Sequence, residues 1–277
     1  MNKLLSANFS RLRKSRVFWL CALSTLLISV VMIYESAGTA AALLERGVVR
    51  HLDDFYFELA PYTGAIMAIF ISLFLGTEYS DGTVRNKLVV GHTRTNIYLA
   101  NLLTCLSGGL IVTALWLIGG LPGLYLIGRF EMGLSGVLTY FLVATGVTAA
   151  FTAIFVWVST LSRNKAVTVV LVIVLWMAMS LAGSGIYDRL HEVEFNGGMA
   201  YINGEFVMVD ETPNPLYLTG SARTVAELLY RVLPTGQAIA MTCTEISTPW
   251  LDIAVSLIVA AVITAVGVLS FRKKDLK

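Results

Sequence analysis

Charged side chains of both signs gather in one stretch of an otherwise apolar sequence, EYSDGTVRNKLVVGHTRTNIYLAN at residues 78–101. The stretch places two carboxylates, those of Glu78 and Asp81, ahead of three basic side chains, Arg85, Lys87 and Arg94. Charges at such spacings can form ion pairs, stabilise helix ends or face a charged partner. A tight turn would be enough to connect the apolar segments on either side, so the stretch indicates a role beyond connection.

Helix start and stop signals divide this stretch into two parts. Ser80 or Asp81 can cap a short helix whose first turn contains Gly82 and Thr83, and Gly91 is a suitable helix stop. A second helix then begins after Thr93, another good N-cap residue, and continues into the next apolar run. The sequence therefore predicts a short helix held between two longer ones.

The surface of this short helix is expected to be mixed. Val84 and Leu88 share one face, whereas Val89 lies on another. We expect the basic side chains Arg85, Lys87 and Arg94 to be available to a cytoplasmic partner. Such a partner would find an apolar contact as well as a charged one.

The rest of the sequence shows no second set of residues with recognisable chemistry. The phosphate-binding motif G-x-x-x-x-G-K-[ST] is absent, so energy from ATP would have to come from another chain. The three histidines fall in three different segments, which disfavours a metal or catalytic site. Glu58, Glu78 and Asp252 lie near the ends of apolar runs and no ionisable group lies in the middle, which disfavours a gradient-driven carrier. We predict no catalytic residue, metal or cofactor in this chain, and the sequence does not identify substrate-binding residues.

The composition is that of a membrane protein. Of 277 residues, 56% are hydrophobic and only 14% are charged, with a mean hydropathy of +0.75. A bilayer core takes about 20 helical residues, and six apolar runs have this length: Val17 to Tyr34, Leu59 to Gly76, Ile97 to Gly120, Leu134 to Leu161, Val167 to Tyr187 and Leu251 to Phe271. We predict an all-α polytopic membrane protein with six transmembrane helices.

The distribution of charge predicts the orientation. If the amino terminus is cytoplasmic, the inner segments contain fourteen of the 20 Lys and Arg residues but only three of the 18 acids, Glu78, Asp81 and Asp275. Basic residues collect on the cytoplasmic side of membranes, so both termini are expected there. The first apolar run is longer than the 7–15 residues of a typical cleaved signal peptide, and we interpret it as an uncleaved span.

Two segments outside the spans have helical patterns. Residues 3–16 place Leu5, Phe9 and Leu12 on one face among basic residues, which is typical of a helix lying on the membrane surface. A frayed basic tail remains an alternative. In the outer segment 35–57, the run TAAALLERGVVRHL predicts a short separate helix.

Residues 188–249 form the largest outer segment and predict a small extracellular cap. Asn203 and Gly204 suit a two-residue turn, so we expect a β-hairpin that pairs Met199–Ile202 with Glu205–Val209. Thr224 and Glu227 have the spacing of a capping box at the start of a helix that ends before Pro234. This cap is too short for a hydrophobic core of its own, so it must pack against the spans or against a partner chain.

The polar stretch also resembles a known family. GTEYSDGTVRNKLVVGHTRTNIYLANLL is similar to the signature of permease subunits of bacterial ATP-binding-cassette (ABC) exporters of the type-two permease class. There an acid at the end of span two is followed by G-T-x-R and G-x-[ST]-R, and the matching positions are Glu78, Gly82, Thr83, Arg85, Gly91, Thr93 and Arg94. The segments NPLYLTG, LPTGQAI and FRKKDLK are similar to later parts of six-span members, so the resemblance covers nearly the whole chain in organisation.

The resemblance implies a role for the polar stretch. It implies that residues 77–96 form a cytoplasmic coupling loop whose helix docks in a groove of an ATPase subunit, with the amino-terminal surface helix beside it. The residues implied in coupling are Glu78, Gly82, Thr83, Arg85, Asn86, Lys87, Leu88, Gly91 and Arg94. A purely structural role, in which Glu78 caps a helix or pairs with Arg85, stays open.

The sequence thus favours a half-transporter membrane domain. We expect three parts: residues 1–187 with the surface helix and spans one to five, the cap 188–249, and residues 250–277 with span six and a basic tail. The expected partners are an ABC ATPase that carries ATP and Mg, a second copy or similar permease, and membrane lipids, but no nucleic acid. The seam between copies would use Gly146 with Ala150 or Gly108 with Gly109, unless these residues pack within one subunit.

The substrate class follows from the apolar and hydroxyl character of the spans. These side chains suit amphipathic peptides, lipids or drugs better than ions or sugars, and export or clearance of an antimicrobial peptide is the leading hypothesis by analogy with the family. The alternative is a membrane sensor or scaffold, whose cap binds a ligand and whose inner loop binds a signalling partner. An ATPase that co-purifies in fixed proportion would favour the transporter.

Overall fold

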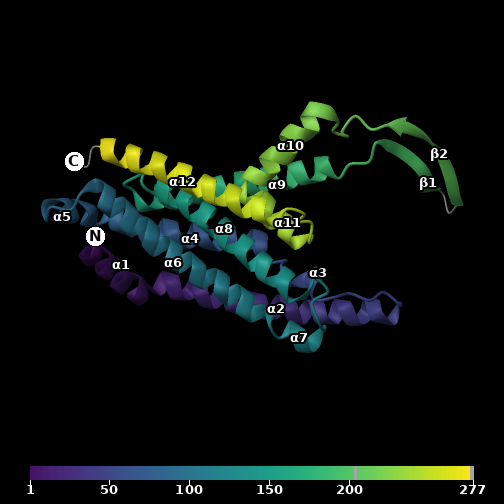
Figure 1. Cartoon of the computed structure of the whole chain (residues 1–277), viewed down its shortest axis with the longest axis horizontal. Coiled ribbons are helices and arrows are strands. Elements are labelled where there is room, and N and C mark those ends of the chain that lie inside the picture. The colour runs from purple at the N-terminus through teal and green to yellow at the C-terminus, as the bar shows by residue number, and fades with distance from the viewer. Residues whose placement is uncertain (203–204, 275–277) are drawn as a thin grey trace.

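The computed structural model describes residues 1–202 and 205–274. Within them, six helices are long and apolar enough to cross a membrane: α2 (Arg16–Glu45), α4 (Ala60–Ser80) with α3 (Asp53–Tyr56) before it, α6 (Arg94–Gly120), α8 (Gly133–Ser159), α9 (Lys165–Leu190) and α12 (Pro249–Lys273). They lie side by side along the long axis of the molecule (Figure 1). The six predicted spans and the all-α polytopic class are confirmed.

Shorter elements occupy the two ends of this bundle. The helices α1 (Asn2–Lys14) and α5 (Thr83–Val89) lie at the end where α12 finishes, whereas α3 and α7 (Gly123–Leu126) lie at the other end (Figure 1). The helices α10 (Gly220–Val232) and α11 (Pro234–Thr242) lie on the side of α9 and α12. We refer to the first end as the α5 end and to the second as the α7 end.

The predicted amino-terminal helix is present, and it packs on the bundle through one face. Its buried side chains are Leu4, Asn8 and Leu12, whereas Phe9 is 40% exposed. A polar amide, that of Asn8, therefore lies in the middle of the buried stripe. The helix ends at Ser15, whose extended backbone separates it from α2 and whose Oγ accepts from the Phe18 N–H at 3.3 Å.

The outer segment after the first span differs from expectation. Residues of the run TAAALLE do not start a separate helix but continue α2 to Glu45. With about 1.5 Å rise per residue, the 30 residues of α2 exceed the length that the hydrocarbon core requires. The reason is local: Ala, Leu and Glu are strong helix formers, and the first stop is Gly47 with its positive φ of 79°.

The small residues proposed for a seam between copies pack inside one chain instead. A Cβ on Gly108 would lie 2.7 Å from the Phe70 ring, and one on Gly109 would lie 2.7 Å from Met67. Gly146 faces Ser256 of α12, and Ala150 is fully buried. These positions therefore allow close approach of α4, α6, α8 and α12 within the subunit.

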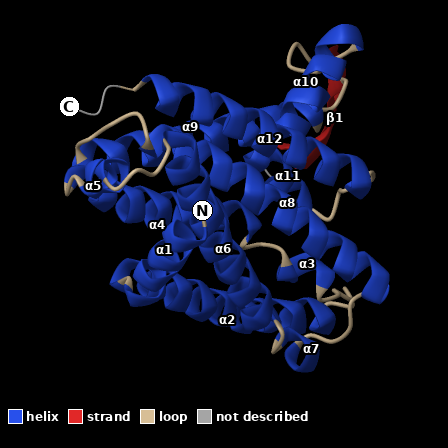
Figure 2. Ribbon diagram, turned by 60° about the vertical axis from the view of Figure 1, so that its left-hand side comes forward, coloured by secondary structure: helices blue, strands red, loops and turns tan. Residues whose placement is uncertain are grey.

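The hairpin pairs β1 (Phe195–Ile202) with β2 (Glu205–Pro213) in antiparallel register, with Ile202 opposite Glu205 and Met199 opposite Met208. The predicted pairing is confirmed, and the ladder continues to Phe195 and Pro213 with an irregularity near Asn196. The proposed turn at Asn203 and Gly204 lies outside the described residues. Figure 1 shows the hairpin projecting away from the helical bundle, and Figure 2 shows its strands in red against the blue helices.

The helix α10 starts earlier than the sequence suggested. Its N-cap is Thr219, so Thr224 lies inside the helix and its hydroxyl donates to the Gly220 carbonyl at 3.3 Å. The predicted capping box is therefore wrong, and Glu227 forms an ion pair with Arg223 at 3.0 Å instead. The helix ends at Val232 as expected, but its apolar residues Val225, Leu228, Leu229 and Val232 are exposed.

The segment LPTGQAI forms α11, which packs against the bundle. It contacts α4, α8 and α9, and Thr235 donates its hydroxyl to the Met179 carbonyl of α9 at 2.7 Å. The Thr242 hydroxyl donates to the Phe57 carbonyl at 3.2 Å. Part of the region after α9 thus packs against the spans, which the short length of this region had led us to expect.

Candidate coupling site at the α5 end

Glu78 is the centre of the site. It lies in the last turn of α4, and its side chain is completely buried although it is a carboxylate. Two cations approach it from different elements: Arg11 Nη1 of α1 lies 2.5 Å from Oε2, and Lys87 Nζ of α5 lies 2.6 Å from Oε1. Buried charges are costly unless paired, so this carboxylate ties α1 and α5 to the end of α4.

Two asparagines complete the polar network. Asn101 of α6 donates its amide to Glu78 Oε1 at 3.3 Å, and Asn8 of α1 donates its amide to Asn101 Oδ1 at 2.7 Å. Lys87 Nζ donates a second bond to Asn8 Oδ1 at 2.9 Å. We call these five residues, Asn8, Arg11, Glu78, Lys87 and Asn101, the Glu78 cluster. It connects four helices through side chains that are mostly withdrawn from solvent.

The surroundings of the cluster fix its members further. The Arg11 guanidinium lies 4.0 Å above the Phe74 ring, a cation–π contact on the preceding turn of α4. The Thr83 hydroxyl donates to the Glu78 carbonyl at 2.8 Å, which holds the start of α5 against the end of α4. Movement of α5 is therefore opposed by bonds to both the side chain and the backbone of Glu78.

Backbone geometry shapes the ends of α5. Gly82 is the N-cap residue with φ of 69°, and Gly91 follows the helix with φ of 94°, both in the region that favours glycine. Neither Ser80 nor Asp81 caps the helix as expected: the Ser80 hydroxyl bonds to Thr77 and Asp81 instead. Thr93 caps α6 as expected, accepting from the Asn96 N–H at 3.3 Å.

The two faces of α5 differ in character. Val84 is buried and Leu88 packs against the core, whereas Val89 is 80% and Val90 76% exposed. Arg85 and Asn86 are also exposed. These four exposed residues, Arg85, Asn86, Val89 and Val90, form an outward patch of mixed charge and apolar surface, which we call the α5 patch.

The sequence suggested that Arg94 is available to a partner, whereas in the structure its side chain is half-buried and bonds within the chain. Its guanidinium Nη1 donates to the carbonyls of Phe271 at 3.4 Å and Arg272 at 3.3 Å, and also to that of Lys274. The Lys274 ammonium in turn donates to the carbonyls of Thr160 and Ser162. Burial, with the nearby charge of Arg163, lowers the pKa of Lys274. Arg94 thus ties the start of α6 to the end of α12.

The sequence-predicted residues therefore divide into four groups. Glu78 and Lys87 meet in the cluster, Arg85 and Asn86 face outward, and Arg94 binds the end of α12. Lys87, with 17% side-chain exposure, points inward rather than to a partner, and Glu78 pairs with Arg11 and Lys87 rather than with Arg85. Gly82, Thr83, Leu88 and Gly91 shape and seat the short helix.

Three residues of the cluster were not predicted from the sequence. Arg11 was counted only as a basic residue of the inner side, and Asn8 and Asn101 were not considered. A signal for the asparagines exists: Asn8 interrupts the stripe of Leu4 and Leu12, and Asn101 lies within an apolar span. An amide in such a position needs a hydrogen-bond partner, which points to a buried polar network.

Comparison with known proteins agrees with this architecture. A family model described as ABC-2 family transporter protein matches residues 4–179, which include most of α1, the Glu78 cluster and the α5 patch. A search of curated proteins found no match. Because the family model covers more than half of the 277 residues, this chain belongs to the ABC-2 transporter family and is a membrane-spanning transporter subunit.

Proposed function

We propose that this subunit takes its energy from a separate ABC ATPase that docks on the α5 patch at the cytoplasmic end of the bundle. The observation that carries the proposal is the buried Glu78 cluster behind that patch. A helix of seven residues presents a mixed surface outward, while Lys87 on its inner side bonds to Glu78. A push on α5 is thereby transmitted to the longer helices.

The path of transmission follows the cluster. Lys87 leads to Glu78 at the end of α4, Asn101 leads to α6, and Arg11 and Asn8 lead to α1. Breaking the cluster would leave a carboxylate or cations buried without a partner, which costs about 3–5 kcal/mol per broken buried pair. Moving the four elements together is cheaper, so motion of α5 carries the ends of α1, α4 and α6 with it.

The distribution of charge supports a cytoplasmic position for the α5 end. Basic residues of α1, α5 and the end of α12 gather there, including Arg13, Lys14, Arg85 and Arg272. Under the positive-inside rule both termini then lie in the cytoplasm. We place the subunit in the cytoplasmic membrane of a bacterium, with ATP and Mg held by the partner ATPase.

The substrate that suits this subunit is amphipathic or hydrophobic. Its spans are lined by aliphatic, aromatic and hydroxyl side chains, and we propose export or clearance of such a compound, with an antimicrobial peptide as the leading hypothesis. A second copy of the chain, or a similar permease, would complete the translocation path. This substrate class rests on analogy with the family and on composition.

Site-specific cross-linking tests the docking. In a background with Cys243→Ser, Asn86→Cys on the α5 patch would be compared with Tyr125→Cys on α7, which is 93% exposed at the opposite end. The other native cysteines, Cys21 and Cys105, are buried. We expect cross-links to a co-expressed ATPase only from Asn86→Cys. Cross-links from Tyr125→Cys alone, or a stable complex with no contact at Asn86, would overturn the proposal.

A further inference from the structure

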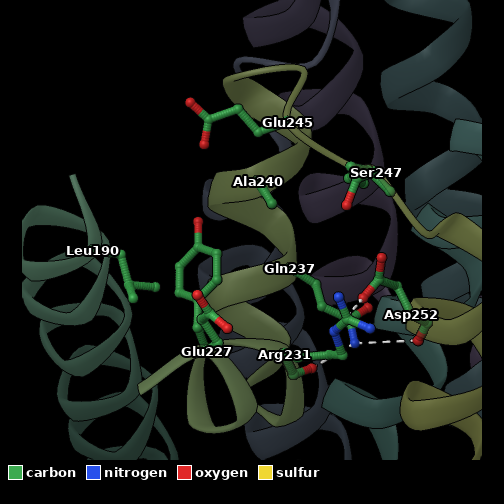
Figure 3. Close-up of a pocket in the computed structure, with 10 residues that line it drawn as sticks. Leu190, Glu227, Arg231, Gln237, Ala240, Glu245, Ser247 and Asp252 are labelled. Carbon is green, nitrogen blue, oxygen red and sulfur yellow. Dashed lines mark hydrogen bonds and ion pairs between the residues drawn. The ribbon is translucent and has the colours of Figure 1, made fainter. Parts of the chain in front are cut away.

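A polar cavity lies between the end of α9, the helices α10 and α11, and the start of α12. Its volume is about 350 Å³, and its walls include Leu190, Glu227, Arg231, Gln237, Glu245 and Asp252 (Figure 3). It lies away from the Glu78 cluster, toward the α7 end. The cavity therefore faces the proposed outer side and has no part in the coupling described above.

The positive charge of the cavity is already neutralised. Arg231 Nε lies 3.2 Å from Asp252 Oδ1, and the dashed line in Figure 3 marks this pair. The Gln237 amide donates to the carbonyls of Arg231 at 2.7 Å and Asp252 at 3.2 Å, and Ser256 donates to Gln237 Oε1 at 2.8 Å. Because Arg231 is held by this network, it is poorly placed to bind an anion.

The negative charge is in excess. Three carboxylates, those of Glu227, Glu245 and Asp252, line the cavity against one guanidinium. Glu245 receives a hydrogen bond from Tyr187 at 3.3 Å and lies 3.1 Å from His191 Nε2, which carries a charge only when protonated. Glu227 pairs with Arg223, but both side chains are largely exposed, and such pairs contribute little.

A buried hydroxyl adds a further polar group. The Tyr230 hydroxyl is withdrawn from solvent and has no hydrogen-bond partner in the part of the chain that the structure describes. Burial raises the pKa of Tyr230, and nearby charges that include Glu245 raise it further. The phenol therefore stays neutral. Its oxygen can accept a hydrogen bond from a ligand, and Leu190, Ala240 and Ile246 supply apolar wall.

We propose that this cavity binds a primary ammonium group on an apolar stem, such as a lysine side chain of an amphipathic peptide. The ammonium would lie near the carboxylate of Glu245 and donate to the Tyr230 hydroxyl, and the methylene stem would lie against Leu190 and Ile246. The inference rests on the proposed function, because it specifies the substrate as an amphipathic cation received at the outer side. It assigns the first contact with substrate to residues of α10, α11 and the segment after α11.

Binding of a defined probe tests the assignment. The purified subunit would be placed in nanodiscs of phosphatidylcholine and titrated with a fluorescent twelve-residue peptide of leucine and lysine. The same peptide with acetylated lysines would serve as the uncharged probe, and empty nanodiscs would correct for lipid binding. We expect the lysine peptide to bind and the acetylated peptide to bind at least about fivefold more weakly.

Two variants act on the cavity in different ways, with a third as the control. Glu245→Gln removes a carboxylate, and Ala240→Trp fills the space without changing charge; each should weaken binding by about fivefold or more. Glu211→Gln removes an exposed carboxylate on β2 and should bind as the unchanged subunit does. If one variant fails to fold, as judged by its melting temperature, binding by the other variant and the comparison of the two peptide probes still test the cavity assignment.

The outcomes separate this inference from the proposed function. Equal binding of both probes, or full binding by Glu245→Gln and Ala240→Trp, would overturn the cavity assignment, as would preference for a glutamate-containing peptide. Because no ATPase or ATP is present, such a result would leave docking on the α5 patch untouched. Loss of docking with intact peptide binding would instead contradict the coupling proposal alone.

Discussion

At the scale of single residues, the Glu78 cluster has an unequal charge balance. One buried carboxylate faces two cations, Arg11 and Lys87; the Asn101 amide donates to the carboxylate, and Asn8 accepts from Lys87. Removing the anion leaves both cations without a counter-charge, whereas removing Lys87 leaves Arg11 to neutralise Glu78. The members of the cluster therefore differ in what their loss costs.

This balance predicts an order of stability. Glu78→Gln should lower the free energy of unfolding by about 3–5 kcal/mol, and Lys87→Met by about 1.5–3 kcal/mol through its lost charged hydrogen bonds. The double variant Glu78→Gln with Lys87→Met should be more stable than the sum of the single losses predicts, because only one cation is then unpaired. Denaturant unfolding in detergent measures all three.

Arg85→Met provides the matched control for this series. Arg85 lies two residues before Lys87 on the same short helix but is exposed, so its replacement should leave stability almost unchanged. If Lys87→Met and Arg85→Met were equally stable, or if the double variant were strictly additive, the carboxylate would not depend on these contacts.

At the scale of elements, α5 uses one face to pack against the bundle and leaves the other face free for docking. Val84 and Leu88 seat the helix, while Val89 and Val90 add no packing and remain exposed. An exposed pair of valines beside Arg85 is an apolar contact surrounded by polar residues, as in the centre of a binding patch. Changes on the two faces should therefore have different consequences.

We predict that Val89→Asp blocks docking without affecting the fold. A carboxylate at an 80% exposed position costs little in the free subunit, but in an interface it would be buried without a partner. Affinity for the ATPase should fall at least about tenfold, while the melting temperature stays close to that of the unchanged subunit. Pull-down with a titrated ATPase and a thermal scan measure the two effects.

Val49→Asp supplies the comparison. This valine is 63% exposed in the loop after α2, so it receives the same substitution far from α5. Equal loss of ATPase binding in both variants would show that the effect is not local. A large drop in melting temperature for Val89→Asp would assign this valine to packing.

The elements also show what the sequence can and cannot reveal. Long apolar runs predict the six spans because a chain segment inside the bilayer has no water to bond to. A helix satisfies all its backbone N–H and C=O groups internally. Gly91 marked the end of α5 correctly, since its positive φ favours glycine, whereas the start was expected at Ser80 or Asp81 and lies at Gly82. Start signals were less reliable: Thr224 and Glu227 had capping-box spacing, but Thr219 starts the helix.

Tertiary partners account for the remaining differences. Nothing within residues 3–16 indicates that Asn8 rather than Phe9 faces the bundle, because the deciding bond is to Asn101, which is distant in sequence. Likewise, Lys87 looked available to a partner because its acceptor, Glu78, comes from another helix. Arg94 was assigned to the partner surface for the same reason, since its acceptors lie at the end of α12.

At the scale of the whole molecule, the structure has two chemically different ends. The α5 end contains the Glu78 cluster and the basic residues of α1 and α12, whereas the other end contains the acids of α3 and the polar cavity. A transporter subunit needs such a difference, because energy enters on one side and substrate is received or released on the other. The membrane orientation of the chain thus decides whether the two proposals are compatible.

We predict that a maleimide reagent that does not cross membranes labels Asn86→Cys only after spheroplasts are permeabilised, and Tyr125→Cys before. Both variants would carry Cys243→Ser, because this cysteine is the half-buried one of the three. The reason is the basic charge gathered at the α5 end, which resists transfer across the membrane. The opposite pattern would place the α5 patch outside, where no ATP is available, and the coupling proposal would fail even if the Glu78 cluster were essential for stability.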